Sequence, residues 1–285
     1  MTQSGRVLTH PAAARKRFEE LARLPDEMLD LVEASLVIAL EAYPALDMER
    51  YFDQIEAWSR AIRERVVGSH DLERVIEQVN HLLFDEEGFH GEADDYYDPR
   101  NAFLNEVLDR HAGLPIALSI LYLEISRRIG IEMRGVALPG RFLVRAGEGL
   151  EEILVDPFDG GRVLTRSECQ SLMDAMYGGA VRLGERHLRP STRHEILLRV
   201  LAHLKALYLS RHDVEGALAS VDRILILDDH DPWELRDRGR LAMQSHRYEE
   251  AIEFLSRYLD LAPSADDYRQ VADEIDYLRS WLERN

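Results

Sequence analysis

The chain has 285 residues, 46% of them hydrophobic and 31% charged, which is the composition of a globular protein with ample length for a buried core. Its net charge of −18 repels phosphate backbones and anionic lipids, so nucleic-acid and membrane-surface partners are not expected. The single cysteine, Cys169, excludes an internal disulfide framework and a thiolate-rich metal site. The most apolar window, residues 29–40, is too short to span a bilayer. We therefore expect a cytoplasmic protein, since a lone cysteine also fits a reducing compartment.

Residues 11–110 are expected to be almost wholly helical. Acidic residues after Pro25 favour a helix start there, because the helix dipole attracts negative charge to its first turn. Apolar residues at spacings of 3 or 4 continue the helical pattern, which predicts helices over 25–43, 47–66, 71–83 and 102–110. Residues 85–100 hold two glycines, a proline and many acids, and are predicted to form a loop.

The pattern changes after residue 110. A helix over 116–129 is apolar on nearly every side, which predicts a central position, and Gly130 ends it. Three short strands follow, separated by turns, and a helix that begins at Thr165 or Ser167 runs to Tyr177. The expected strands are 133–138, 142–145 and 151–156. The predicted fold class is therefore α+β, mostly helical with a small antiparallel sheet.

From residue 191 onward the sequence is helical and repeats itself. Ala217 and Ala251 stand 34 residues apart, as do Val214 and Tyr248, Val221 and Leu255, and Leu201 and Leu235. This period, with small residues where two helices meet, is typical of tetratricopeptide repeats. The expected architecture is an N-terminal extension over 1–24, a domain over 25–190, and C-terminal helical repeats over 191–285 with a capping helix at 266–282.

The segment that begins at Gly113 resembles the nucleophile helix of transglutaminase-like proteins. In those proteins Gly-x-Cys opens a helix, Gly-Ile follows fifteen residues after the cysteine, and a strand comes next. Here Gly113, Gly130, Ile131 and Val136 fall at these offsets, and Pro115 stands at the cysteine position.

Two further positions complete the resemblance to a Cys-His-Asp triad. The next strand of such folds carries the histidine after a glycine, and here that dipeptide is Gly140 and Arg141. The third strand ends in Asp-Pro, which is intact as Asp156 and Pro157. The resemblance implies a transglutaminase/papain-like fold whose triad reads Pro115, Arg141 and Asp156.

The order of the motifs along residues 25–280 also resembles the bacterial SirB family, in which a transglutaminase-like domain precedes tetratricopeptide-like repeats. The shared features are G-x-P-I-x-L-S-x-L-Y, P-G-x-F-L-V-R, D-P-F-x-G-G and the terminal repeats. Many members of the family read P-G-H-F, so Arg141 is a departure from its pattern. The resemblance implies a fold and leaves the molecular function undefined.

The substitutions in the triad predict a pseudoenzyme. Proline carries no nucleophile, and arginine stays protonated and cannot act as a general base. Asp156 alone can do neither, so we expect the site to be catalytically inactive, with Arg141 and Asp156 forming a structural ion pair. Gly113, Ser119, Gly140 and Pro157 are the expected neighbours of this cleft.

The leading hypothesis is a non-catalytic scaffold or regulator that binds another protein or peptide through this cleft and the helical repeats. The alternative is a hydrolase or acyltransferase with relocated residues, in which Cys169 or Ser119 is the nucleophile and His111 or His90 the base. Ser119 lies one helical turn past Pro115, on the same face. Neither hypothesis needs a cofactor, and the sequence does not indicate the oligomeric state.

A metal site is the remaining possibility in the acidic loop. The candidate ligands are His81, His90, Asp94, Asp95 and Asp98. Their spacing matches no calcium loop, so a solvated acidic loop is the expected state.

Overall fold

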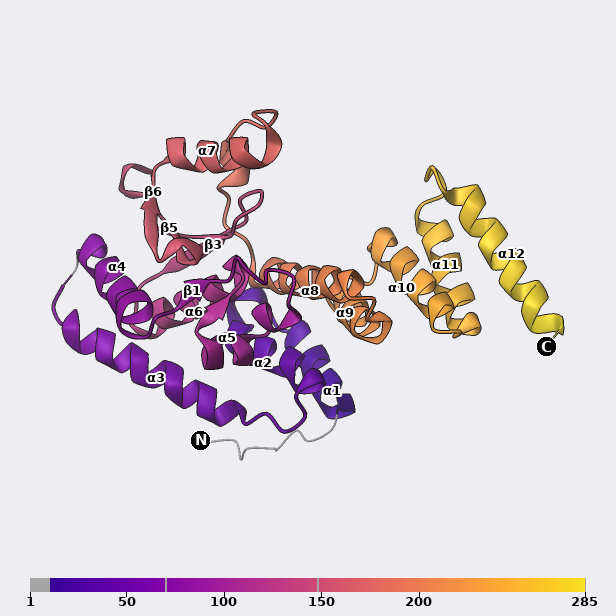
Figure 1. Ribbon diagram of the computed structural model, residues 1–285, viewed down its shortest axis with the longest axis horizontal. Coiled ribbons are helices and arrows are strands. Elements are labelled where there is room, and N and C mark those ends of the chain that lie inside the picture. Colours follow the sequence, from indigo (N-terminus) through magenta and orange to yellow (C-terminus); the bar gives the residue numbers. More distant parts are fainter. Residues whose placement is uncertain (1–10, 70, 148, 285) are drawn as a thin grey trace. The chain divides into compact units, whose positions relative to one another are not determined.

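The computed structural model describes residues 11–69, 71–147 and 149–284 (Figure 1). The chain divides into two compact units, the first ending at Leu197 and the second beginning at Leu198. The first ten residues of the expected N-terminal extension lie outside the described residues. None of the helices in the described ranges is long and apolar enough to cross a bilayer.

The first unit is built mainly from helices. Its α-helices in the described ranges, before α8 (Arg193–Ser210), are α1 (Pro11–Ala22), α2 (Leu31–Ala42), α3 (Met48–Arg65), α4 (Leu72–Asn80), α5 (Leu104–Arg110), α6 (Pro115–Arg128) and α7 (Arg166–Tyr177). The expected single helix over 25–43 is wrong. Asp26–Met28 form a separate 3-10 turn, η1, and α2 begins only after Asp30. The reason is that the Asp30 carboxylate accepts a hydrogen bond from the backbone N–H of Glu33 at 2.9 Å and so caps a new helix.

The region predicted as a helix to residue 83 and then a loop also differs from expectation. α4 ends at Asn80 and is followed by a π-helical segment, η2 (His81–Glu86). β1 (His90–Gly91) then pairs in parallel with β2 (Ala112–Gly113), the dipeptide just before α6. The acidic segment is therefore partly ordered against the start of α6.

Four short strands form one antiparallel sheet in the order β3-β4-β5-β6. They are β3 (Met133–Val136), β4 (Leu143–Ala146), β5 (Ile153–Asp156) and β6 (Arg162–Leu164). The three predicted antiparallel strands are confirmed, whereas β6 was not predicted, because it has three residues and only Leu164 is buried. α6 packs against β3 and β4, and α7 lies on the other side of the sheet (Figure 1).

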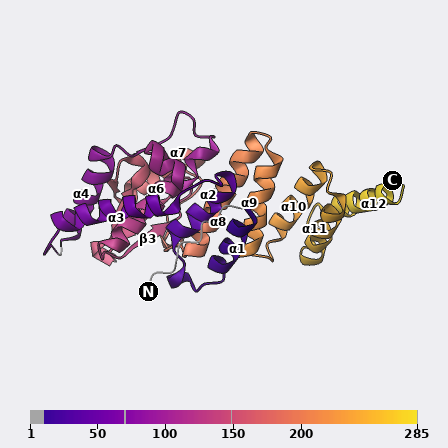
Figure 2. The ribbon, with the colours of Figure 1, turned by 90° about the horizontal axis from the view of Figure 1, so that it is seen from below.

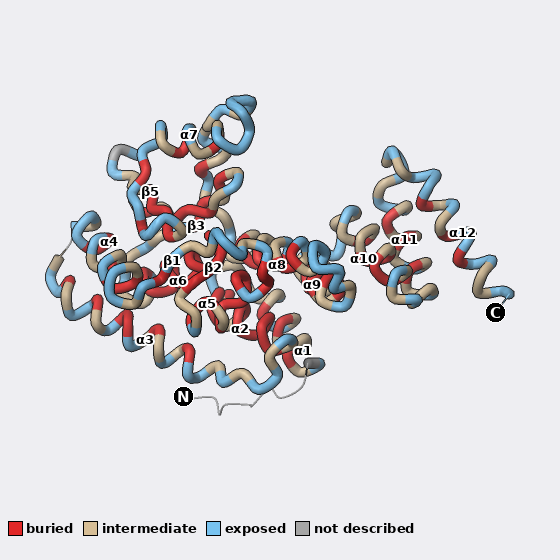
Figure 3. The backbone as a smooth tube through the Cα atoms, viewed as in Figure 1, coloured by how far each residue is buried: buried red, intermediate tan, exposed pale blue. Residues whose placement is uncertain are grey.

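The core of the first unit lies along α6 and α2. Every residue of α6 from Pro115 to Ser126 is buried, which explains its apolar character on all sides (Figure 3). A smaller apolar cluster lies between the sheet and α7 and contains Val136, Leu138, Leu143, Leu154, Leu164, Cys169, Met173 and Leu188. The predicted α+β class, mostly helical with a small antiparallel sheet, is confirmed.

The second unit is a run of antiparallel helices, each of which packs on the next (Figure 2). After α8 (Arg193–Ser210), whose first residues belong to the first unit, come α9 (Val214–Leu227), α10 (Pro232–Gln244), α11 (Tyr248–Leu261) and α12 (Tyr268–Arg284). A Cβ added at Gly239 would lie 2.6 Å from Leu255, so only glycine allows α10 and α11 to approach so closely. The helix expected at 266–282 is observed as α12.

Candidate functional site

The structure brings Arg141 and Asp156 together from neighbouring strands. Arg141 follows a turn in which its N–H donates to the carbonyl of Leu138 at 3.0 Å, and it lies just before β4, whereas Asp156 is the last residue of β5. Arg141 Nε lies 3.7 Å from Asp156 Oδ2, an ion-pair distance for these two atoms. The Asp156 side chain is 1% exposed and the Arg141 side chain is 25% exposed, so the pair reaches the surface only on the arginine side.

Asp156 is held in place by the backbone as well as by Arg141. Its carboxylate accepts the N–H of Phe158 at 3.0 Å and so caps the short 3-10 helix η5 (Pro157–Asp159). Burial raises the pKa of Asp156 above its usual value, and the nearby Arg141 charge opposes that rise. Burial therefore disfavours the charged form of this carboxyl, and the Arg141 guanidinium and the backbone N–H of Phe158 favour it.

Phe158 is a member of the site that the sequence analysis did not single out. The guanidinium carbon of Arg141 lies 4.7 Å from the centroid of its ring, a cation–π contact. A Cβ added at Gly91 would lie 2.5 Å from the Phe158 ring, so β1 also packs tightly on this residue. The signal was present in the D-P-F motif, of which only the aspartate and the proline were used.

The N-terminal end of α6 lies beside the start of β4. Pro115 is the first residue of the helix, where its missing N–H costs nothing. One turn later, Ser119 is fully buried and its hydroxyl donates to the carbonyl of Phe142 at 3.2 Å. Because Phe142 is the neighbour of Arg141, this bond fixes the first turns of α6 next to the start of β4.

The glycines and the proline expected around the cleft have structural roles. A Cβ at Gly113 would lie 2.6 Å from Val107, so glycine is required for the β2 segment to pack on α5. Gly140 has φ +77°, and a Cβ there would lie 1.6 Å from the sulfur of Met176 on α7. Pro157 is buried and begins η5.

The residues considered for a relocated active site are held in other ways. Cys169 is fully buried. Burial and the nearby carboxylate of Asp156 raise the pKa of this thiol to about 11, which disfavours the reactive thiolate. The ring of His111 stacks on Phe89 with centroids 4.4 Å apart, and its Nδ1 contacts the carbonyl of Glu87. Nδ1 of His90 lies 3.1 Å from the carbonyl of Gly88.

The acidic loop does not assemble a metal site in the described part of the chain, where no three His, Cys, Asp or Glu side chains are grouped to hold an ion. Asp98 caps η3 (Pro99–Asn101), since its carboxylate accepts from the backbone N–H of Arg100 at 2.9 Å and from the Arg100 side chain.

Comparison with known proteins places this arrangement in a family. Residues 49–202 match the family model described as transglutaminase-like superfamily, and residues 204–276 match the tetratricopeptide repeat model. A UPF0162 protein of Xylella fastidiosa (strain 9a5c) is 36% identical over 257 residues, which cover 89% of this chain and 92% of the relative. The chain belongs to the UPF0162 family. The resemblance to SirB-type proteins, with a transglutaminase-like domain followed by tetratricopeptide repeats, is thereby confirmed.

Two other relatives show how far the likeness extends. The UPF0162 protein of Vibrio cholerae is 27% identical over 239 residues, which cover 84% of this chain and 88% of the relative. Human F-box only protein 21 is 36% identical over 118 residues, 37% of this chain and 19% of that protein. Among solved structures, menin covers 90% of this UPF0162 chain and 71% of its own at a TM-score of 0.43 and 14% identity, and we infer nothing from so low a score.

Proposed function

We propose that this UPF0162 protein is a non-catalytic scaffold or regulator. In this proposal the region around Pro115, Arg141 and Asp156 and the tetratricopeptide-like repeats both bind another protein or peptide in the cytoplasm. The observation that carries the proposal is the position of Arg141, whose Nε lies 3.7 Å from the buried carboxylate of Asp156. By the resemblance to transglutaminase-like proteins, this permanent cation takes the position at which those proteins carry a proton-accepting histidine, and that assignment supports the proposal.

The charge of Arg141 argues against proton transfer at this site. A general base must be able to lose and regain its proton near neutral pH, and a guanidinium cannot. The side chain at the start of α6 is a proline ring, which offers no nucleophile. What the site offers is a guanidinium that is 25% exposed and rests on an aromatic ring, and a guanidinium of this kind suits the carboxylate of a bound peptide.

The second unit supports a binding role through its repeats, since tetratricopeptide repeats generally mediate contacts between proteins. Trp233, in the first turn of α10, exposes about half of its side chain and packs against Arg236, whose guanidinium carbon lies 4.9 Å from its ring. Exposed tryptophan and arginine side chains are the residue types most often found in the centres of protein interfaces.

Activity-based labelling tests the absence of catalysis. The purified protein is treated with a thiol-directed and a serine-directed probe, alongside Cys169→Ala and Ser119→Ala variants. We expect no time-dependent labelling above that of the heat-unfolded protein, because both side chains are buried. Rapid labelling of the native chain that either variant removes would refute the proposal and support a relocated nucleophile.

Site-specific photo-crosslinking in the native cell tests the binding role. A photoreactive residue replaces Met176, which contacts the site at Gly140, or Trp233 on the repeats. Val67, which is more exposed than either, serves as a control outside both regions. We expect discrete adducts at Met176 and Trp233, none at Val67, and loss of the Met176 adduct when Arg141→Leu is added. Adducts that are the same at all three positions, or absent from all, would contradict the proposal.

A further inference from the structure

The first unit contains a cavity of about 460 Å³ at the C-terminal end of α6, the end opposite Pro115. Leu123, Glu124 and Arg127 of α6 line it. Because a helix rises about 1.5 Å per residue, Arg127 lies about 18 Å along α6 from Pro115. The cavity is thus separate from the Arg141–Asp156 pair, and nothing argued from it rests on the function proposed for that pair.

One wall of the cavity is the edge of the sheet. β3 is an outer strand, and its residues Met133–Gly135 line the cavity. The segment before α8 covers only the other half of this edge: Ser191 N–H donates to the carbonyl of Gly135 at 2.8 Å, and Pro190 forms a bridge with Val136. The edge is therefore half occupied, and the cavity lies where an added strand would continue.

The pairing pattern shows which backbone groups face the cavity. In an antiparallel ladder, the N–H and C=O of successive residues point alternately to the two sides of a strand. Since the carbonyl of Gly135 points away from β4 toward Ser191, the N–H and C=O of Met133 point away from β4 too. These groups can form hydrogen bonds with an incoming extended chain, as in other cases of strand addition.

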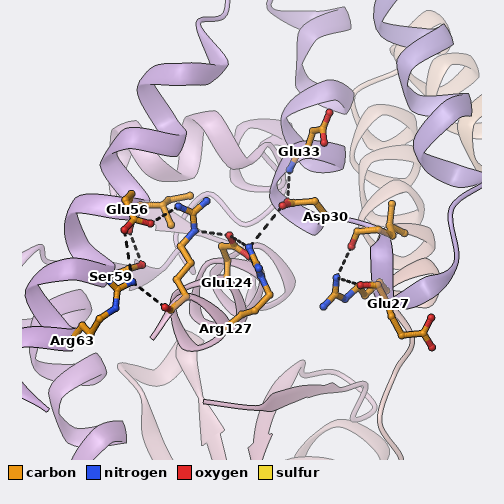
Figure 4. A network of polar contacts seen from close by, with 12 residues as sticks. Glu27, Asp30, Glu33, Glu56, Ser59, Arg63, Glu124 and Arg127 are labelled. Atoms are coloured by element: carbon orange, nitrogen blue, oxygen red, sulfur yellow. Dashed lines mark hydrogen bonds and ion pairs between the residues drawn. The ribbon is translucent and has the colours of Figure 1, made fainter. Parts of the chain in front are cut away.

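The guanidinium groups that line the cavity are already engaged. Arg127 donates two hydrogen bonds to the buried carboxylate of Glu124, at 2.8 and 2.7 Å, and Figure 4 shows it between Glu124 and Asp30. Nη1 of Arg193 donates to the carbonyls of Leu29 and Glu27, at 2.8 and 3.2 Å. Arg134, the third, donates twice to Oε1 of Glu132.

Two carboxylates at the cavity, Glu124 and Asp26, are engaged by Arg127 and His194, whereas Glu27, Asp30 and Glu132 retain acceptors. Asp30 Oδ2 is 3.9 Å from Arg127, beyond hydrogen-bond length. Both hydrogen bonds from Arg134 reach Oε1 of Glu132, and within the described residues no donor reaches its Oε2 or the side chain of Glu27. The ligand that complements this lining is a cation rich in N–H donors.

We propose that the β3 edge and this cavity bind an extended segment of another protein that carries lysine or arginine. The segment adds as an antiparallel strand beside Met133, and one basic side chain enters the cavity among Glu27, Asp30 and Glu132. The volume fits this occupant, because cavities of about 300–1,000 Å³ hold ligands larger than one lysine side chain. The backbone bonds supply affinity for any extended chain, and the spare carboxylate oxygens select the basic one.

Fluorescence anisotropy with synthetic peptides on the full chain tests this site. The probe is fluorescein-labelled Val-Lys-Val-Lys-Val-Lys-amide, compared with the same peptide bearing glutamate for lysine. A third peptide keeps the lysines and carries N-methyl groups on alternate backbone nitrogens, which removes donors for strand pairing. We expect saturable binding of the first peptide and at least tenfold weaker binding of both others. Absent binding, or equal binding of the glutamate or N-methylated peptide, would overturn the proposal.

Charge variants locate the binding on the molecule. Glu27→Gln combined with Glu132→Gln alters two exposed side chains at the cavity and is expected to weaken binding about fivefold or more. Glu64→Gln combined with Glu73→Gln removes the same charge from exposed positions on α3 and α4 and should leave the affinity unchanged. If both pairs weaken binding equally, the peptide is responding to the net charge of −18 and the proposed site is wrong.

Discussion

Replacing Arg141 with leucine should destabilise the first unit in a pH-dependent manner. The change leaves the carboxylate of Asp156, which is 1% exposed, with the backbone N–H of Phe158 as a hydrogen-bond donor but without its guanidinium partner. At the observed 3.7 Å, the attraction between two unit charges is about 4 kcal/mol at an effective dielectric constant of about 20.

The net loss should be smaller than this attraction. Arg141 is 25% exposed, so water already screens the pair, and breaking it should cost less than the ~3–5 kcal/mol typical of fully buried pairs. Loss of the contact with the Phe158 ring adds about 0.5–1 kcal/mol. We expect a total of about 2–3 kcal/mol at pH 7 for Arg141→Leu. Arg141→Lys, which keeps the charge, should cost less.

The pH dependence separates the electrostatic part from the packing part. Burial raises the pKa of Asp156 in the folded protein, so its charge costs stability at pH values above that pKa and the cost disappears as the carboxyl is protonated. Arg141→Leu removes a cation that lowers this pKa, and should raise it further. The destabilisation should therefore shrink as the pH falls from 7 toward 4, leaving the packing loss.

Urea unfolding at a series of pH values, with the double-mutant cycle of Arg141→Leu and Asp156→Asn, measures this effect. The side-chain amide that Asp156→Asn introduces still has an oxygen that can accept the Phe158 N–H, but it carries no charge. Arg141→Leu should therefore cost only about 1 kcal/mol in the Asp156→Asn background. A cost that is the same in both backgrounds, or one that grows as the pH falls, would refute the electrostatic reasoning.

Three further results are expected. In urea unfolding, Gly140→Ala should cost about 2 kcal/mol or more, because its Cβ would meet Met176, whereas Gly178→Ala, at φ +58° with open space, should cost about 1 kcal/mol. Cys169, with its pKa raised to about 11, should react with iodoacetamide at pH 8 far more slowly than in the unfolded chain; equal rates would contradict its burial. Burial lowers the pKa of His203 to about 4, so unfolding monitored against pH should show stability lost as the pH falls from about 6.5 toward 4, and His203→Gln should flatten that profile.

Much of the fold could be predicted because its signals are local and periodic. The apolar residues of α3 recur at helical spacing, and the 34-residue period identified the repeats without any knowledge of their packing. Asp30 shows where such reasoning failed. The residue lies inside an apparently continuous helical pattern. Its side chain accepts a hydrogen bond from the N–H of Glu33, and this cap separates η1 from the start of α2. β6 was missed for a related reason, since its exposed residues Arg162 and Val163 give no alternating pattern.

The sequence predicted that Arg141 and Asp156 lie together, but it did not predict the aromatic ring beside them or the cavity at the other end of α6. Arg141 and Asp156 could be placed together because the resemblance to transglutaminase-like proteins assigns each of them a position next to a strand, and the structure brings the two side chains within 3.7 Å. The ring of Phe158 under the guanidinium could not, since a turn residue has no periodicity to show which way it points. The cavity at the other end of α6 was invisible in the sequence, because its walls come from segments more than 150 residues apart, between Asp26 and Arg193.

The fold's tolerance of Pro115, at the position where the resemblance to transglutaminase-like proteins implies a cysteine, has a physical explanation in α6. The buried side chains of this helix, from Pro115 to Ser126, hold α2, α3 and the sheet together, and none of those contacts requires a cysteine at its first turn. Proline at that position even suits the helix, because it lacks an N–H that would have no partner. The stability of this framework therefore places no demand for a cysteine at the start of α6. Stability also accounts for Arg141, which pairs with the buried Asp156. It does not account for the exposed carboxylates of Glu27 and Glu132 near the other end of α6, for which we propose a role in binding.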